Sequence, residues 1–149
     1  MAQLVKTTSE LWVSVSHGRF IILDDDGLAD EPDGVPSLMD DEDERGDEWF
    51  RPAYNGVDID GPFSDYDPDV VLELWDGPPP ERPGWARTAS GEVFFSSGRV
   101  HLNNIFGDGD SANSFNLGEK TRTWSLRCHA RPSRDDEEEF LLQFWPTPF

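Results

Sequence analysis

The sequence has a single cysteine, few basic residues and no long apolar run. Cys128 therefore has no partner for an internal disulfide, and this sparing use of cysteine is typical of cytoplasmic proteins, so we expect a cytoplasmic chain. No apolar stretch approaches the roughly 20 residues that a membrane-spanning helix needs. Met1 to Ser16 also lacks the basic and apolar regions of a signal peptide, and we expect no membrane contact.

The scarcity of basic side chains leaves a large excess of negative charge. Twelve Lys and Arg residues stand against 31 Asp and Glu residues, and the formal net charge of the 149 residues is -19. Such a surface repels nucleic-acid phosphates, so we expect no direct binding of nucleic acid. A basic protein is the kind of partner that this charge favours.

Aromatic residues are plentiful, which separates this chain from disordered acidic proteins. Six Trp, ten Phe and two Tyr residues supply the large side chains that a hydrophobic core requires. A chain of this length fits one domain. We therefore predict a single folded domain over residues 1–149.

Nearly all the excess charge lies in one part of the chain. Between Phe20 and Pro80 there are 20 acidic and 2 basic residues, a net charge of -18. We predict an acidic loop or insertion over residues 24–69. Charge that served only solubility would be spread over the surface, so its concentration favours a directed electrostatic field. A solvated loop without a partner remains the alternative.

Short runs with a two-residue apolar period predict the fold. Residues 11–16 place Leu11, Val13 and Val15 on one face and Trp12, Ser14 and Ser16 on the other. Similar runs occupy residues 19–23, 70–75, 122–129 and 139–145, and a hairpin is predicted over 92–104. Because no window keeps a helical apolar stripe, we predict an all-β protein, an antiparallel β-sandwich or barrel of about 7–8 short strands.

The sequence gives no support for an enzyme or for a cofactor. Cys128 and His129 are adjacent on a predicted strand, so their side chains point to opposite faces and cannot form a nucleophile–base pair. Cys128 is better interpreted as a small core residue. His17, at a predicted turn, and His101, on a predicted strand, accompany no recognisable nucleophile motif. We therefore predict a protein without catalytic residues.

The high density of carboxylates also raises the question of calcium. The helical calcium loop needs oxygen ligands at positions 1, 3 and 5, Gly at 6 and Glu at 12. Loops that start at Asp41 or at Asp108 fail this spacing. An irregular site joining separate loops remains open, and its candidate ligands are Asp24, Asp26, Asp108 and Asp110.

The strongest interpretation is a protein-binding surface in which carboxylates alternate with aromatic side chains. The carboxylates would meet the Lys and Arg groups with which a partner otherwise binds phosphate, and the aromatics would supply selectivity. The predicted contact residues are Asp40, Asp41, Glu42, Asp43, Glu44, Asp47, Glu48, Trp49, Phe50, Tyr54, Asp58, Asp60, Asp65, Tyr66 and Asp67.

Two stretches of the sequence resemble a known family. The first stretch has a short strand, a His-containing turn and a second strand, with Val15, Ser16, His17 and Phe20 at the matching positions. The second has a Gly-led strand, a polar loop, an apolar-polar run that ends at a turn with Gly, and a last strand. Its matching residues are Gly98 to Ile105, Ser114 to Gly118 and Thr123 to Cys128. In this order the chain resembles the competence-associated DNA-entry nuclease inhibitor family. The resemblance implies a small all-β protein that binds and blocks a nuclease or toxin, and it assigns no contact residue.

Together, these observations predict a non-enzymatic inhibitor or immunity-type protein. Its acidic surface, which imitates a nucleic acid in charge, would bind a basic partner such as a nuclease. The alternative is a small β-sandwich binding module whose acidic loops bind calcium or are only solvated.

Overall fold

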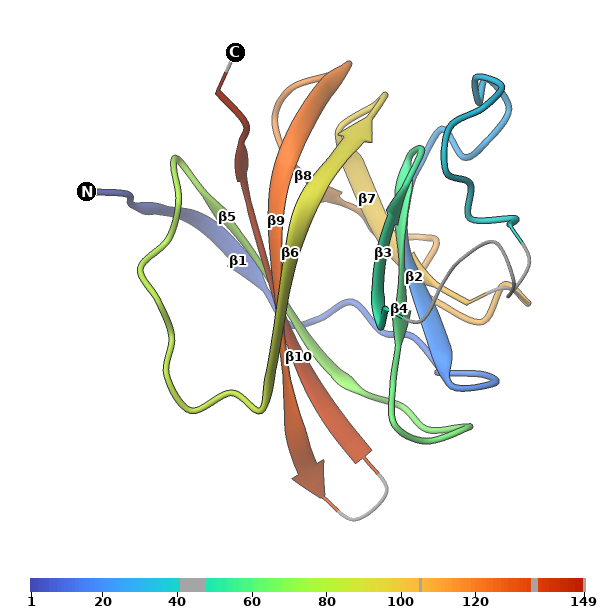
Figure 1. Ribbon diagram of the computed structural model, residues 1–149, viewed down its shortest axis with the longest axis vertical. Helices are drawn as coiled ribbons and strands as arrows, with labels where there is room; N and C mark the ends of the chain where they lie inside the picture. Colours follow the sequence, from blue (N-terminus) through green and yellow to red (C-terminus); the bar gives the residue numbers. More distant parts are fainter. Residues whose placement is uncertain (41–47, 105, 135–136, 149) are drawn as a thin grey trace.

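The computed structural model describes residues 1–40, 48–104, 106–134 and 137–148. Within these ranges, ten strands form two five-stranded sheets that pack face to face (Figure 1). The prediction of an all-β, sandwich-like fold is therefore confirmed. The described residues include no helix long and apolar enough to cross a membrane.

The first sheet has the strand order β1-β5-β10-β9-β6. Its strands are β1 (Leu4–Thr8), β5 (Asp69–Trp75), β6 (Arg87–Phe95), β9 (Arg122–Arg134) and β10 (Glu137–Pro146). Neighbouring strands are antiparallel except β5 and β10, which run parallel, with Val70 opposite Phe140. The last strand in the sequence thus lies at the centre of the sheet.

The second sheet has the order β3-β4-β2-β7-β8 and is antiparallel throughout. Its strands are β2 (Arg19–Asp24), β3 (Phe50–Ala53), β4 (Gly56–Asp60), β7 (Arg99–Asn103) and β8 (Phe115–Asn116). The described part of residues 24–69, called the acidic segment below, therefore lies mostly in this sheet and its loops.

The hydrophobic core lies between the sheets and follows the two-residue period of the strands. Phe20 and Ile22 of β2 face Leu126, Cys128 and other residues of the first sheet, and all four are fully buried. Burial raises the pKa of the Cys128 thiol, so this group stays protonated and unreactive. The prediction that Cys128 is a core residue is confirmed.

The predicted strand over residues 11–16 is replaced by isolated bridges. Val13 pairs with Gly109 and Val15 with Tyr66, so the two ends of this run lie against different segments and no continuous ladder forms. The predicted faces are nevertheless correct, because Val13 and Val15 are buried and Trp12 is exposed.

The described residues form ten strands rather than the predicted 7–8, because the apolar pattern did not predict β1, β3, β4 or β8. Two of these, β3 and β4, lie within the acidic segment. Asp58 of β4 is only 2% exposed, and it accepts hydrogen bonds from the guanidinium groups of Arg19 and Arg51 at 3.0 Å each. These ion pairs offset the cost of placing a carboxylate in a sheet.

The first acidic loop is held to the sandwich by the buried carboxylate of Asp24. This carboxylate accepts hydrogen bonds from the backbone amides of Ser97 and Gly98, both at 3.1 Å, and from the Ser97 hydroxyl at 2.8 Å. Gly98 has φ of +74°, which aims its amide into the turn between β6 and β7. Asp24 therefore joins β2 to the connection between the two sheets.

Replacing Asp24 with Ala is expected to lower the free energy of unfolding by about 2–4 kcal/mol, because it leaves buried backbone amides without an acceptor. Urea denaturation measures the change. The matched control is Asp30→Ala in the same loop, where the side chain is exposed. Equal effects of the two substitutions would show that Asp24 has no special structural role.

Candidate functional site

An acidic depression lies where three loop segments meet at one end of the sandwich. It has a volume of about 620 Å³ and is open to solvent. Its lining residues are Ser14, Val15, Ser16, Asp65, Tyr66, Asp67, Asn104, Asp108 and Glu137. Four of the nine are carboxylates, and they come from segments up to 72 positions apart in the sequence.

The segment before β2 forms the middle of the depression. The amide of Val15 donates to the carbonyl of Tyr66 at 2.7 Å, and the amide of Ser14 donates to the carbonyl of Asp108 at 3.3 Å. Since Val13 and Val15 point into the core, Ser14 and Ser16 point outward. The two-residue alternation predicted from the sequence therefore places polar side chains between the loop of Asp65 and Asp67 and the loop of Asp108.

Asn104 fixes the loop that contains Asp108 against the segment of residues 14–16. Its side-chain amide donates to the carbonyl of Ser14 at 2.8 Å, and its Oδ1 accepts from the backbone amides of Phe106 and Asp108 at 2.8 and 3.0 Å. The loop also approaches β7 very closely, since a Cβ on Gly109 would lie 2.2 Å from the carbonyl oxygen of Leu102. Asp108 is thus held at the edge of the depression by a rigid backbone.

The negative charge of the depression is largely uncompensated. Asp67 accepts a hydrogen bond from the Ser14 hydroxyl at 2.8 Å, and Asp65 accepts one from the backbone amide of His17 at 3.4 Å. In the described parts of the chain, Asp65, Asp67 and Asp108 form no ion pair with a basic side chain. The depression therefore attracts cationic groups, and neutral hydroxyls and amides position its carboxylates.

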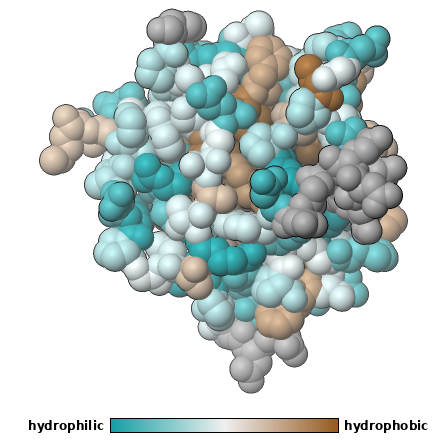
Figure 2. Space-filling view, viewed as in Figure 1, coloured by the Kyte–Doolittle hydropathy of each residue, from teal (hydrophilic) through white to brown (hydrophobic). Residues whose placement is uncertain are grey.

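Three exposed aromatic residues belong to the segments that line the acidic depression. Trp12, Phe63 and Phe106 are 54%, 37% and 62% exposed. Phe106 packs on the ring of His17 with 5.3 Å between centroids, and Phe63 packs edge-on against Tyr66 at 6.0 Å. Elsewhere the face drawn in Figure 2 is mostly hydrophilic, with hydrophobic residues in small groups. Exposed aromatic side chains are enriched at protein-binding surfaces.

Tyr66 lines the depression with its hydroxyl group buried. Burial raises its pKa above the ordinary range, and the nearby Glu138 carboxylate acts in the same direction. The ring is held in place because Gly61 has no side chain: a Cβ there would lie 2.1 Å from the Tyr66 hydroxyl. Tyr66 therefore shapes the wall without adding charge.

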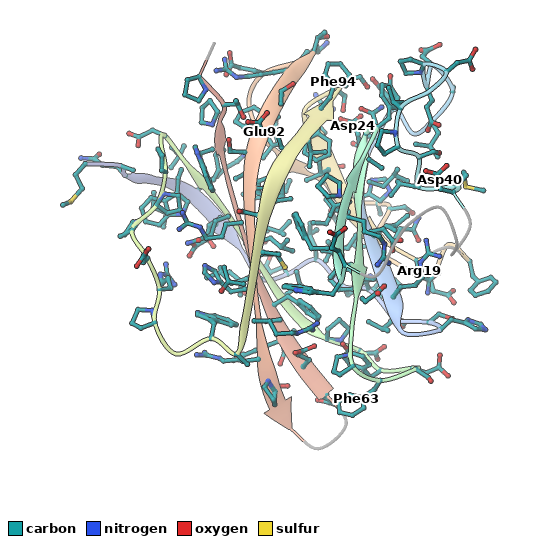
Figure 3. The ribbon with its side chains drawn as sticks, in the orientation of Figure 1. Arg19, Asp24, Asp40, Phe63, Glu92 and Phe94 are labelled. Carbon is teal, nitrogen blue, oxygen red and sulfur yellow. The ribbon has the colours of Figure 1, made fainter. Side chains whose placement is uncertain are left out.

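Only some of the predicted contact residues lie at this surface. Asp65, Tyr66 and Asp67 line the acidic depression together with Asp108, which the sequence suggested only as a calcium ligand. Asp40, Glu48 and Asp60 lie elsewhere on the acidic segment, and Asp60 pairs with Arg51. Figure 3 places Phe63 and Asp24 toward opposite ends of the sandwich, so the acidic segment extends along its length.

The expectation of exposed contact residues is wrong for Phe50 and Asp58. The rings of Trp49 and Tyr54, also expected as partner contacts, have packing partners within the protein. Phe50 is 6% exposed and belongs to the core, and Asp58 is buried in its ion pairs. Trp49 packs against the core with the Arg87 guanidinium 4.2 Å from its ring, and Tyr54 stacks on Phe94 at 5.7 Å. These aromatics anchor the acidic segment to the sandwich.

The remaining predicted contacts lie outside the described residues. They are Asp41, Glu42, Asp43, Glu44 and Asp47.

The four candidate calcium ligands do not form one site. Asp24 is fully buried, with its oxygens occupied by the turn at Ser97, and the Asp110 carboxylate accepts a hydrogen bond from the backbone amide of Asn113 at 3.2 Å. Among the residues that the structure describes, no group of three or more His, Cys, Asp or Glu side chains is arranged to hold a metal ion. The irregular calcium site thus gains no support.

The sequence did not single out Asn104, the exposed aromatics or Glu137 as parts of a site. Ser14 and Ser16 were placed correctly on the polar face of their run, but nothing local indicated which loops would lie beside them. One local signal could have indicated a binding surface: the sequence places Trp12 on the polar face of the run together with Ser14 and Ser16, and Trp12 is exposed in the structure.

Comparisons with known proteins bear on the fold. No family model and no curated protein sequence matches the chain. Its structure is similar to that of ComJ from Bacillus subtilis, an inhibitor of the DNA-degrading activity of NucA, with a TM-score of 0.62, 14% identity and 99% of both chains covered. It is also similar to the product of crocagin biosynthetic gene J, with a TM-score of 0.59, 10% identity and 99% of both chains covered. The resemblance read in the sequence is thereby confirmed in its fold: this chain has the fold of the nuclease inhibitor ComJ.

Proposed function

We propose that this chain is a non-enzymatic inhibitor that binds a basic nuclease through the acidic depression. The observation that carries the proposal is that Asp65, Asp67 and Asp108 form no ion pair with a basic side chain of the described residues, while exposed aromatic residues lie nearby in the same segments. The likeness to ComJ, which inhibits a nuclease, supports the same class of role. A partner's phosphate-binding Lys and Arg groups would meet carboxylates in place of phosphates.

In the proposed mechanism, net charge attracts the partner and the shape of the depression positions its cationic side chains. The net charge of -19 draws a basic partner toward the molecule and accelerates association at low ionic strength. The depression then seats one or more cationic side chains, while Trp12, Phe63 and Phe106 exclude water from the contact. Occupation of the partner's phosphate-binding groups would block access of its DNA substrate.

The further contact residues are proposed from charge alone. Asp40 and Glu48 extend the negative field beyond the depression, whereas Arg51 compensates the charge of Asp60. We expect all three to affect the association rate more than the lifetime of the complex, and Asp60 least. A cytoplasmic location and the absence of a cofactor belong to the same proposal.

Inhibition is expected to depend on the depression rather than on net charge. The chain is immobilised and exposed to a lysate of its own organism at 50 and 300 mM NaCl, and a nuclease that elutes with salt is purified and assayed for DNA degradation. We expect the triple substitution Asp65→Asn, Asp67→Asn and Asp108→Asn to weaken inhibition at least 100-fold at the lower salt concentration, because it removes three unpaired charges.

A matched control removes the same charge elsewhere. The triple substitution Asp30→Asn, Asp33→Asn and Glu119→Gln changes exposed residues outside the depression, and we expect inhibition within threefold of the unmodified chain. If both triple variants weaken inhibition equally, the depression has no special role. If no nuclease is captured or inhibited at either salt concentration, the proposed function is wrong.

Removing the same three carboxylates is also expected to stabilise the isolated protein. Like charges gathered in one depression repel one another, so the variant with Asn at 65, 67 and 108 should melt about 1–3 °C higher at 10 mM NaCl. The gain should disappear at 0.5 M NaCl, where charges are screened within a few ångströms. Calorimetry of both proteins at the two salt concentrations measures this, and a lower Tm at low salt would show that these carboxylates are structural.

A further inference from the structure

A second concave site lies on the opposite side of the sandwich, over the outer face of the first sheet. The connection between β5 and β6, drawn in yellow-green in Figure 1, runs along this face. Together with β6 and β9 it encloses a cavity of about 590 Å³. The lining residues are Glu81, Arg82, Pro83, Thr88, Arg127 and His129.

Beneath the cavity, a row of polar side chains crosses four neighbouring strands. Glu73 of β5 accepts a hydrogen bond from the Gln143 amide of β10 at 3.0 Å, and Gln143 Oε1 lies 3.1 Å from His129 Nε2 of β9. His129 Nδ1 lies 2.8 Å from the hydroxyl of Thr88 on β6. Glu73, Gln143 and His129 are 7%, 0% and 3% exposed. Buried polar groups cost free energy, so a row of this kind needs its complete set of partners.

The direction of each hydrogen bond in this row follows from the chemistry of Glu73. The carboxylate only accepts, so the Gln143 NH₂ group must face it and the Gln143 oxygen must face His129. His129 therefore carries its proton on Nε2, and Nδ1 accepts from the Thr88 hydroxyl. Burial lowers the pKa of His129, which keeps the imidazole neutral at pH 7. The Thr88 oxygen is left with its lone pairs directed away from His129.

Arg127 brings a positive charge to the cavity without a carboxylate partner in the described residues. Its guanidinium donates to the carbonyl of Pro79 at 3.2 Å and lies 5.3 Å from the ring centre of Trp145. The other cavity guanidinium, Arg82, is already paired with Glu73 at 3.1 Å. In a protein with a net charge of -19, an arginine placed at a cavity without an ion pair indicates an anionic ligand.

The charges around the cavity favour one negative charge over two. Arg127 offers a cation that forms no ion pair within the described residues, and Glu81 in the lining and Glu73 below would repel a dianion such as phosphate. The Thr88 oxygen adds an acceptor for a ligand N–H group. A carboxylate next to an amide N–H, as at the end of a peptide, satisfies both groups.

We propose that this cavity binds the carboxylate of a small organic acid or of a peptide C-terminus, with Arg127 as the cation and Thr88 as the acceptor for an adjacent N–H group. Trp85 packs on the lining residue His129 at 5.6 Å between ring centres, and the Arg131 guanidinium lies 4.0 Å from the Trp85 ring centre. The site lies apart from the acidic depression and does not depend on the proposed function.

Calorimetry and NMR with four probes test the proposal: N-acetylglycylglycine, its C-terminal amide, acetate and inorganic phosphate. We expect the free acid to bind saturably, with a Kd on the order of a few millimolar for a ligand of about 12 non-hydrogen atoms, and to shift the indole signals of Trp85 and Trp145. The amide and phosphate should bind at least tenfold more weakly. Tighter binding of acetylglycylglycine than of acetate identifies a peptide terminus as the source, whereas the reverse identifies a free acid and contradicts the role of Thr88.

Variants assign the two roles separately. Arg127→Gln should weaken binding of both carboxylate probes at least tenfold, whereas Thr88→Val should weaken acetylglycylglycine and leave acetate unchanged, because acetate has no N–H group. Arg99→Gln, an exposed arginine on β7 of the second sheet, is the matched control and should bind as the unmodified chain does. The melting temperature of each variant reports its fold. If Arg127→Gln fails to fold, the acid and amide probes still decide on the unmodified chain.

Three results would overturn the proposal. They are the absence of saturable binding by either carboxylate, equal binding of the acid and its amide, and phosphate binding as tight as that of the acid.

Discussion

The buried carboxylate of Asp24 is the contact on which the arrangement of the acidic segment depends. The turn that it holds connects β6 of the first sheet to β7 of the second. Asn55 reinforces the same turn, since its Oδ1 accepts from the amide of Ser96 and its Nδ2 donates to the carbonyl of Gly27. One buried charge, neutralised by backbone amides rather than by a basic side chain, thereby fixes where the strongly charged segment leaves the sandwich.

The carboxylates of this chain fall into two groups with different physical consequences. Asp24, Asp58 and Glu73 are buried with donors, and their solvation by protein groups holds the fold together. Asp65, Asp67 and Asp108 remain exposed beside one another, where their mutual repulsion is relieved only by solvent or by a cationic partner. The distribution of partners, and not the number of acidic residues, separates structure from the surface proposed to bind.

Local patterns predicted the strands that bury alternate apolar residues, and they failed where another interaction replaced that period. Residues 19–23, 70–75 and 139–145 were found because apolar residues repeat every second position. β4 was missed because Asp58 occupies a buried position, where it pairs with Arg19 and Arg51. In the site, Asp65 and Asp67 followed from charge, but the positions of Asn104 and Phe106 depend on contacts with Ser14 and His17, about 90 residues earlier in the sequence, which no local pattern reveals.

The parallel pairing of β5 with β10 has a consequence for how the protein is made. β10 fills the gap between β5 and β9, so the first sheet stays divided until residues near 140 have left the ribosome. Until then β5 lacks its parallel neighbour in the first sheet, and the ordering of pairs about 70 residues apart slows folding. The high negative charge of the early segment then has a second use, because it keeps the unfinished chains from associating with one another.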